Sequence, residues 1–215
     1  MNMRKLDRTA CPAPACLAVY NANVDNWNHV SGQHKAEIRV QLEAIQGKRC
    51  AYCEGDLNVL GQHIEHFRRK KKHPHLTFEW INLYWSCDQT DSCGHFKDHG
   101  AGQYDVADLI DPCTDDPDDF FIFRSDGTIN VRRGLSAHDE HRARETLRVF
   151  SLDADWGRLR AMRKAAVSGY VSDADEAFNA GLSLDDIHEY FADVLQYAKD
   201  LPFYTAIRHV LLERQ

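Results

Sequence analysis

Two pairs of closely spaced cysteines constrain the fold of this 215-residue chain more than any other feature. Two residues separate Cys50 from Cys53, five separate Cys87 from Cys93, and 33 residues lie between the pairs. A Cys-x2-Cys turn lets two thiolates converge on one ion, and a second pair can complete a tetrahedron around zinc. Four thiolate ligands leave no place for a catalytic water. The spacing therefore predicts a structural zinc site.

Two other roles for the cysteines were weighed. A redox Cys50-x2-Cys53 motif would need a thioredoxin-like βαβ pattern, which the neighbouring sequence lacks. A disulfide framework would need an oxidising compartment, and the opening Met-Asn-Met-Arg-Lys-Leu-Asp-Arg has no apolar signal-peptide segment. We therefore expect a cytoplasmic protein with reduced thiols, in which Cys11, Cys16 and Cys113 are buried or surface thiols. No apolar run approaches the ~20 residues that span a bilayer, so no membrane partner is expected.

The sequence before the first cysteine pair predicts a loop-rich arm followed by one helix. Residues 1–30 contain prolines and several asparagines but little periodicity. A helix is then expected between Ser31, a suitable N-cap, and Gly47, which can end it. Its buried face would carry three apolar residues spaced four and three apart, Ile38, Leu42 and Ile45.

Short elements are expected between and after the cysteines. Residues 57–60 and 63–67 are predicted to be strands joined by a turn at Gly61, and a short helix should follow Cys93 and end at Gly100. The β-prone runs 120–123 and 128–131 flank Ser-Asp-Gly and predict a hairpin. Helices fill the rest of the chain. Their expected N-terminal residues are Ser136, Asp153, Ser183 and Pro202.

A dense set of polar residues lies between the cysteine pairs. Glu65 and His66 are adjacent, and neighbouring side chains of a strand point to opposite faces, so only a strand end or a bulge can aim both at one atom. The basic run 68–72 is placed to contact phosphates, because a protein of net charge −7 must bind nucleic acid through local positive charge or through a basic partner. His95 and His99, four residues apart, would share one helix face within reach of a single cation.

The order of these motifs resembles a known family. Cys-x2-Cys, Ile-Glu-His-Phe, Trp-x-Asn-Leu, Ser-Cys and Cys-Gly-His-x-Lys-Asp follow one another as in the HNH endonucleases with the ββα-metal fold. More narrowly, the chain is similar to the HNH proteins of bacterial anti-phage systems, namely the Septu nuclease subunit and the retron-associated HNH proteins. Ala-Tyr-Cys-Glu at 51–54, Ile-Asp-Pro at 110–112 and Gly-Thr-Ile at 127–129 extend the resemblance to the flanks.

The resemblance implies an α+β fold. Its centre would be a zinc-stabilised ββα-metal (HNH) core at 48–103, with an N-terminal arm and helix at 1–47. A hairpin and a mainly helical extension would occupy 104–215 and pack on the core as one unit.

The resemblance also implies roles for individual residues. His66 matches the general base that activates water, Glu65 a ligand of the catalytic magnesium or manganese, and Asn82 the residue that orients the loop carrying the base. Many HNH enzymes place His or Asn directly after the last cysteine, where this chain has Gly94. We therefore expect His95 as the third catalytic and metal-binding residue. His99 is the second candidate ligand. The expected phosphate contacts are Arg68, Arg69, Lys70, Lys71, Lys72 and Lys97.

Three functions are consistent with these features. The first is a metal-dependent endonuclease that cuts DNA in an anti-phage system together with a companion ATPase. In a retron setting, a reverse transcriptase and its RNA–DNA product would be further partners. A variant of this first function is an HNH nuclease that cuts RNA instead of DNA. The second is a non-catalytic zinc module with a degenerate HNH site, which Gly94 favours and the Glu65, His66 and Asn82 set disfavours. The third is a zinc-stabilised protein without enzymatic activity.

Overall fold

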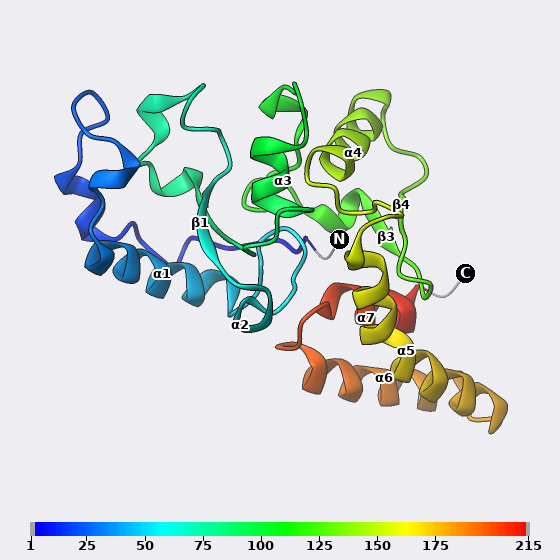
Figure 1. Cartoon of the computed structure of the whole chain (residues 1–215). Helices are drawn as coiled ribbons and strands as arrows, with labels where there is room; N and C mark the ends of the chain where they lie inside the picture. The colour runs from blue at the N-terminus through cyan, green and yellow to red at the C-terminus, as the bar shows by residue number, and fades with distance from the viewer. Residues whose placement is uncertain (1–2, 214–215) are drawn as a thin grey trace.

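The computed structural model describes residues 3–213, which form an N-terminal arm, a central ββα unit and a mainly helical C-terminal half (Figure 1). The arm contains the short 3-10 helices η1 (Ala15–Val19) and η2 (Trp27–His29) and the helix α1 (Gly32–Gln46). The predicted start of α1 is confirmed, because the Ser31 side chain accepts a hydrogen bond from the backbone N of His34. The predicted end is confirmed at Gly47, whose φ of 63° lies in the left-handed region.

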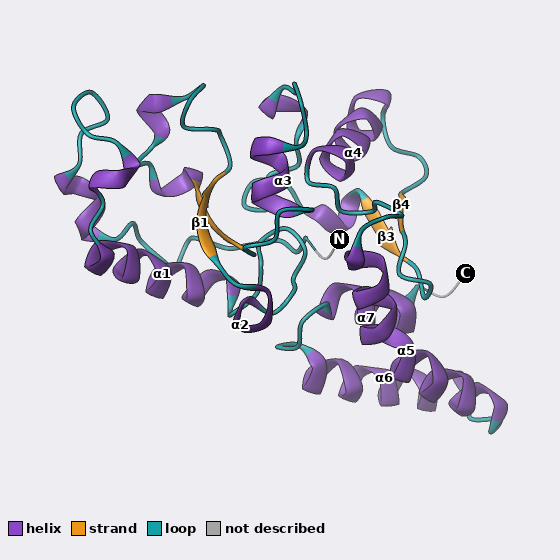
Figure 2. Ribbon diagram, in the orientation of Figure 1, coloured by secondary structure: helices purple, strands orange, loops and turns teal. Residues whose placement is uncertain are grey.

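A hairpin followed by a helix fills the stretch between the cysteine pairs (Figure 2). Its elements are α2 (Leu57–Leu60), β1 (His63–His66), η3 (Pro74–Leu76), η4 (Trp80–Asn82), β2 (Leu83–Ser86) and α3 (Cys93–His99). Strands β1 and β2 pair antiparallel, with Glu65 opposite Tyr84 and His66 opposite Leu83. Helix α3 ends at Gly100 as predicted. This α+β arrangement is consistent with the ββα-metal fold.

The prediction of a strand at 57–60 is wrong, because these residues form a single turn of α-helix. The side chain of Asp56 caps that turn by accepting a hydrogen bond from the backbone two residues further on, at 2.8 Å. Leu57 and Leu60 are buried and Val59 is exposed. Burial three residues apart is helical spacing, and it places both leucines on the core.

The C-terminal half contains the predicted hairpin and a set of helices. Its elements are η5 (Val106–Asp108), η6 (Pro117–Asp119), β3 (Phe121–Phe123), β4 (Ile129–Val131), α4 (Ala137–Val149), α5 (Arg158–Asn179), α6 (Leu184–Ala198) and α7 (Tyr204–Leu212). Strands β3 and β4 pair antiparallel, which confirms the hairpin. Ser136 and Ser183 cap α4 and α6 through their side chains, as predicted.

Two helix starts differ from the prediction. The Asp153 side chain does not cap α5, which begins after Gly157, because its carboxylate instead accepts a hydrogen bond from the backbone N of Ile129 in the hairpin, at 3.0 Å. Pro202 precedes α7 rather than lying in its first turn, since the N-cap of that helix is Phe203.

The C-terminal half packs directly on the turn that carries the first cysteine pair. The Arg49 guanidinium donates to the carbonyl oxygens of Lys199 and Leu201, at 2.9 and 3.2 Å. The Glu54 carboxylate accepts from the backbone N and the hydroxyl of Thr205, at 3.1 and 3.0 Å. Buried apolar side chains from the arm, the ββα unit and the C-terminal half belong to one cluster. Within 3–213, every helix is too short or too polar to cross a membrane.

Candidate active site

The two cysteine pairs converge, as predicted. One sulfur atom from each of Cys50, Cys53, Cys87 and Cys93 lies within 4.8 Å of the other three, and all four residues are buried. In a tetrahedral site with zinc–sulfur bonds of about 2.3 Å, the sulfur atoms lie about 3.8 Å apart. A compact group of four buried thiol sulfurs therefore fits zinc in both geometry and donor type.

Backbone hydrogen bonds hold this cysteine cluster to β2. The backbone N of Ala51 donates to the carbonyl of Trp85 at 2.9 Å. Gln46, which is not among the predicted site residues, is buried and bonds the backbone of both Arg49 and Trp85 at 2.9–3.0 Å. The end of α1, the first cysteine pair and β2 are thereby tied together before any metal is bound.

Glu65 is a buried carboxylate that faces α3. One of its oxygens, Oε2, lies 3.1 Å from Nε2 of His63, and the other, Oε1, forms an ion pair with Nζ of Lys97 at 2.7 Å. Burial alone would raise the pKa of Glu65. The charge of Lys97 and the hydrogen bond from His63 outweigh burial and lower that pKa to about 2. Glu65 is therefore ionised at neutral pH, as a metal-binding carboxylate must be.

Gly94 leaves the space that the Glu65 carboxylate occupies. A Cβ atom at position 94 would lie 2.6 Å from Oε2 and 2.8 Å from the carboxyl carbon of Glu65. Cβ atoms essentially never lie within 3.0 Å of another heavy atom to which they are not bonded, so any other residue at position 94 would displace the carboxylate. Many HNH enzymes have His or Asn at this position. Here a glycine gives the Glu65 carboxylate the space in which it lies.

A group of three metal-capable side chains lies next to Glu65. The His63 and His95 rings stack with their centroids 4.1 Å apart, and Oδ1 of Asp88 lies 2.7 Å from Nε2 of His95. One ligand atom from each of these three residues lies within 4.8 Å of the other two. Sequence reasoning identifies only His95 of this group. The signal for His63 is its position two residues before Glu65, on the same face of β1.

His99, the second candidate ligand, lies outside this group. Its ring centroid is 6.4 Å from that of His95, and the residue is exposed. Of the predicted ligands, Glu65 and His95 therefore lie together on one side of β1. Glu65 forms a hydrogen bond with His63 there, and the His95 ring stacks on the His63 ring. His99 does not lie with them.

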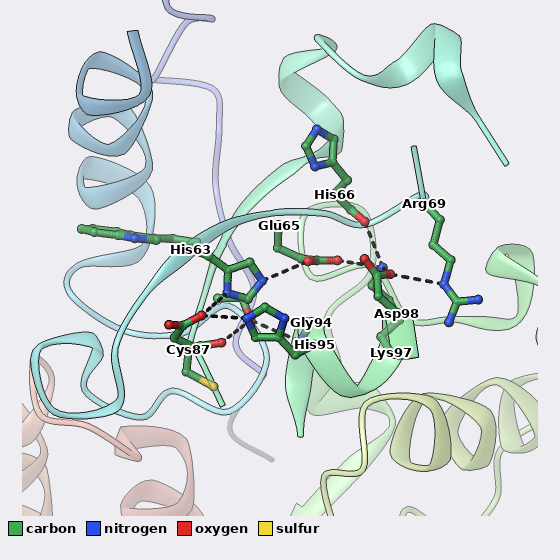
Figure 3. A network of polar contacts seen from close by, with 12 residues as sticks. His63, Glu65, His66, Arg69, Cys87, Gly94, His95, Lys97 and Asp98 are labelled. Atoms are coloured by element: carbon green, nitrogen blue, oxygen red, sulfur yellow. Dashed lines mark hydrogen bonds and ion pairs between the residues drawn. The ribbon is translucent and has the colours of Figure 1, made fainter. Parts of the chain in front are cut away.

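His66, the predicted base, lies on the other face of β1. Figure 3 shows its ring pointing away from Glu65, His63 and His95. The ring is buried, packs edge-on against Trp27 at 4.5 Å, and places Nε2 at 3.0 Å from the carbonyl oxygen of Thr77. The alternation of side chains along a strand produces this separation.

The surroundings of His66 favour a neutral imidazole with one defined tautomer. A carbonyl only accepts hydrogen bonds, so Nε2 must carry the proton that it donates to Thr77, and Nδ1 keeps a lone pair. Nζ of Lys70 lies 3.3 Å from this Nδ1. Burial and the charge of Lys70 lower the pKa of His66 to about 3. An imidazole that is unprotonated at neutral pH can accept a proton from water.

Asn82 is fully buried and holds the loop that follows β1. Its Oδ1 accepts from the backbone N of Arg68 at 2.7 Å, and its Nδ2 donates to the carbonyls of Arg68 and Leu76 at 3.1 and 3.0 Å. Both polar atoms of the amide are therefore used to close this loop. Thr77, which bonds His66, follows directly after Leu76.

The predicted phosphate contacts fall into two groups. Lys70, Lys71 and Lys72 are exposed. Lys97 is not, because its side chain has 0% exposure and pairs with Glu65 and Asp98. The prediction that Lys97 contacts a phosphate is corrected accordingly, since the structure gives it the role of counter-ion to Glu65.

Arg68 and Arg69 are partly buried. The guanidinium of Arg68 lies over the Phe67 ring, and Nε of Arg69 pairs with Asp98 at 3.2 Å. Arg69 also lies over the Tyr104 ring, with 4.5 Å between its guanidinium carbon and the ring centroid. These two arginines are thus already engaged by the protein and are less exposed than the three lysines that follow them.

Comparison with known proteins points to the HNH defence proteins as a class. No protein-family model matches the chain. A retron Vc95 protein of Vibrio cholerae serotype O1 biovar El Tor, named as a candidate HNH endonuclease, is 29% identical over 126 residues, which cover 55% of this chain and 58% of that protein. The chain is therefore related to the HNH proteins of bacterial defence systems.

Two Septu proteins are also similar. Septu protein PtuB of Bacillus mycoides (strain KBAB4) is 26% identical over 142 residues, which cover 54% of this chain and 46% of that protein. Septu protein PtuB of Bacillus thuringiensis is 31% identical over 96 residues, with 44% and 35% covered. The chain spans about half the length, or less, of the curated relatives that it matches.

Proposed function

We propose that this chain is a metal-dependent HNH endonuclease that hydrolyses phosphodiester bonds of DNA in an anti-phage defence system. The observation that carries the proposal is the state of His66. It is neutral, its tautomer is set by Thr77, and Asn82 closes the loop around it, so it is held as a general base. The relationship to HNH defence proteins supports the reaction class.

The residues divide the work of hydrolysis between them. His66 accepts the proton of the attacking water at Nδ1, and Asn82 keeps the loop in position. The ammonium of Lys70, now 3.3 Å from Nδ1, has to leave this atom before it can act, and a substrate phosphate would attract it away. His66 is the last residue of β1 and Glu65 directly precedes it, so we place the scissile phosphodiester at this end of the strand.

A bound magnesium or manganese ion would supply charge stabilisation at the phosphate and at the leaving oxygen. On the opposite face from His66, the ionised Glu65 lies beside His63, Asp88 and His95, whose side chains could hold such an ion. The zinc of the cysteine cluster would be separate and structural. We place the substrate on the exposed lysines at 70–72.

The names of the relatives suggest partners for this activity. The names place the relatives in Septu and retron systems, which supports a defence system with partner components. On the resemblance stated above, the companion would be an ATPase and, in a retron setting, also a reverse transcriptase with its RNA–DNA product. We propose that the nuclease acts with such a partner in the cytoplasm.

One observation favours a second candidate function, a zinc module that docks on a partner or nucleic acid without cutting it. Glu65 is neutralised by Lys97, and His66 faces away from the metal-capable group. An HNH nuclease directed at RNA is a third outcome, which the assay distinguishes when RNA takes the place of the plasmid.

The test is plasmid nicking with magnesium or manganese, in the presence of the companion ATPase. His66→Ala should lower the nicking rate by about 10²-fold or more, the usual contribution of a general base. His66→Gln, whose side-chain amide can reach the position of Nε2 and donate to Thr77, should be similarly inactive while preserving the fold. The exposed His75→Ala serves as the matched control and should cut like the parent.

Two results would contradict the proposal. Cutting by His66→Ala at the parental rate removes His66 as the base. A parent protein that cuts neither DNA nor RNA, with zinc content and thermal unfolding intact, identifies the chain as a non-catalytic zinc module.

A further inference from the structure

Three side chains beside Glu65, those of His63, Asp88 and His95, could together bind one metal ion. We propose that His63, Asp88 and His95 together bind one divalent transition-metal ion, with Glu65 orienting the His63 ring. This inference rests on the proposed function in one respect, because it names the ligands of the metal that the nuclease would use. Metal binding itself can be measured without any cleavage.

The atoms that would meet the ion are already close to coordination geometry. Oδ1 of Asp88 lies 2.7 Å from Nε2 of His95 and 3.7 Å from Nδ1 of His63. Ligands that each lie about 2.1 Å from one ion are about 3.0–3.4 Å apart in octahedral and tetrahedral sites. Shifts of a few tenths of an ångström, within the freedom of an exposed aspartate, would bring both distances into that range.

The two ring nitrogens of His63 have different surroundings, and this difference is the one expected of a histidine that binds a metal ion. Nε2 lies 3.1 Å from Oε2 of the ionised Glu65, so Nε2 carries the proton and Nδ1 has the lone pair. Nδ1 is buried, yet has no hydrogen-bond partner within 3–213. A carboxylate on one nitrogen and an ion on the other is the usual environment of a metal-binding histidine.

The scaffold holds the three ligands on separate elements that the cysteine cluster fixes. His63 begins β1, Asp88 directly follows Cys87, and His95 lies two residues after Cys93. Two of the ligands are therefore carried by backbone that the structural zinc would anchor. Filling the cysteine cluster would pre-arrange this second site.

The donor set predicts which ions bind. Two imidazoles and one carboxylate suit manganese, nickel or zinc, whereas magnesium prefers oxygen ligands. Three protein ligands also leave coordination positions open for water and a phosphate oxygen. The proposal differs from the assignment based on Glu65, His95 and His99, because it makes Glu65 a positioning residue and excludes His99.

Manganese titration followed by electron paramagnetic resonance tests the site, because free Mn²⁺ has a strong signal that weakens on binding. The protein is used with its cysteine cluster filled with zinc and without nucleic acid. The parent should bind one Mn²⁺ ion, and its affinity for Mn²⁺ should exceed its affinity for Mg²⁺, measured by competition. His63→Ala and Asp88→Asn should each weaken binding at least about 10-fold.

The controls separate this site from its alternatives. His99→Ala and the distant His75→Ala should bind Mn²⁺ like the parent. Cys50→Ser should lower the zinc content, and with it the Mn²⁺ affinity, because the filled cysteine cluster pre-arranges the site. A parent that binds no Mn²⁺, a His63→Ala variant that binds it unchanged, or a His99→Ala variant that loses it would each overturn the proposal. Binding at these residues without cleavage of any nucleic acid would refute the proposed function and support the metal site.

Discussion

At the scale of single residues, Gly94 and Lys97 show how this site differs from the HNH pattern that the sequence resembles. Gly94 gives Glu65 the room to lie against α3, and Lys97 supplies the buried countercharge at 2.7 Å. Glu65 remains ionised because that charge outweighs the cost of burial. The two α3 residues thus set the position and the charge of one carboxylate.

Gly94→Ala should reveal that coupling as a loss of stability. The added Cβ would lie 2.6 Å from Oε2 of Glu65, so the buried ion pair with Lys97 must shift. Overpacking of this kind costs about 1–3 kcal/mol, which exceeds the gain of about 1 kcal/mol from replacing a helical glycine. Urea unfolding measures the difference.

The matched control is Gly169→Ala in α5, where a Cβ would meet nothing within 4 Å. That variant should be as stable as the parent or gain up to about 1 kcal/mol. Equal stabilities for Gly94→Ala and Gly169→Ala would mean that Glu65 has more room than the structure gives it.

At the scale of elements, the start of α7 is fastened to the turn that carries Cys50 and Cys53. The Glu54 carboxylate accepts two hydrogen bonds from Thr205 in the first turn of α7. Arg49, on the other side of the cysteine turn, bonds the carbonyls that precede this helix. The C-terminal helices are thereby joined to the zinc-binding part of the molecule by polar contacts as well as by the core.

Glu54→Ala should loosen this connection. It removes the capping carboxylate and leaves the buried backbone N of Thr205 without a partner, at a cost of about 1–3 kcal/mol. Chemical denaturation should show the loss, and hydrogen exchange should place it in α7. The exposed Glu43→Ala should change stability by less than about 0.5 kcal/mol. Unchanged exchange in α7 would mean that the apolar core alone holds this helix.

At the scale of the whole molecule, charge is unevenly distributed. The net charge is −7, yet Lys70, Lys71 and Lys72 are exposed in one run after β1. Lys70 already contacts His66, so Lys71 and Lys72, the latter with its ammonium near the Tyr104 ring, are the exposed lysines of this run that we expect to meet a phosphate backbone. An acidic protein that meets nucleic acid through so short a basic run should bind it weakly and with a shallow salt dependence.

The double variant Lys71→Ala/Lys72→Ala should therefore weaken DNA binding about equally for all sequences. Each phosphate contact that is lost lowers the slope of log affinity against log salt by about 1, so the slope should fall by about 2. Fluorescence anisotropy at several salt concentrations measures it. Lys48→Ala/Lys164→Ala, which removes the same charge elsewhere, should leave the slope unchanged. A similar loss in both variants would mean that only total charge matters.

Local sequence determined much of this protein. The cysteine spacing predicted the four-thiol cluster, and Ser31, Ser136 and Ser183 predicted helix starts, because caps and short-range spacing act within a few residues. The alternation of a strand raised the condition that only a strand end or a bulge could aim both Glu65 and His66 at one atom, and in the structure the two side chains lie on opposite faces of β1 (Figure 3). Residues 57–60 were predicted wrongly, since four apolar or amide residues carry too short a pattern to distinguish a strand from a helical turn.

Only the tertiary structure decided which side chains meet. His63, Asp88 and His95 come together through the β1–β2 pairing and the packing of α3, and no local pattern specifies either. Asp153 is drawn to the hairpin instead of capping α5, and Lys97 is buried beside Glu65 instead of facing solvent. The physical reason is the same in each case. A charged or polar side chain takes the partner that folding brings within reach, and that partner is distant in sequence.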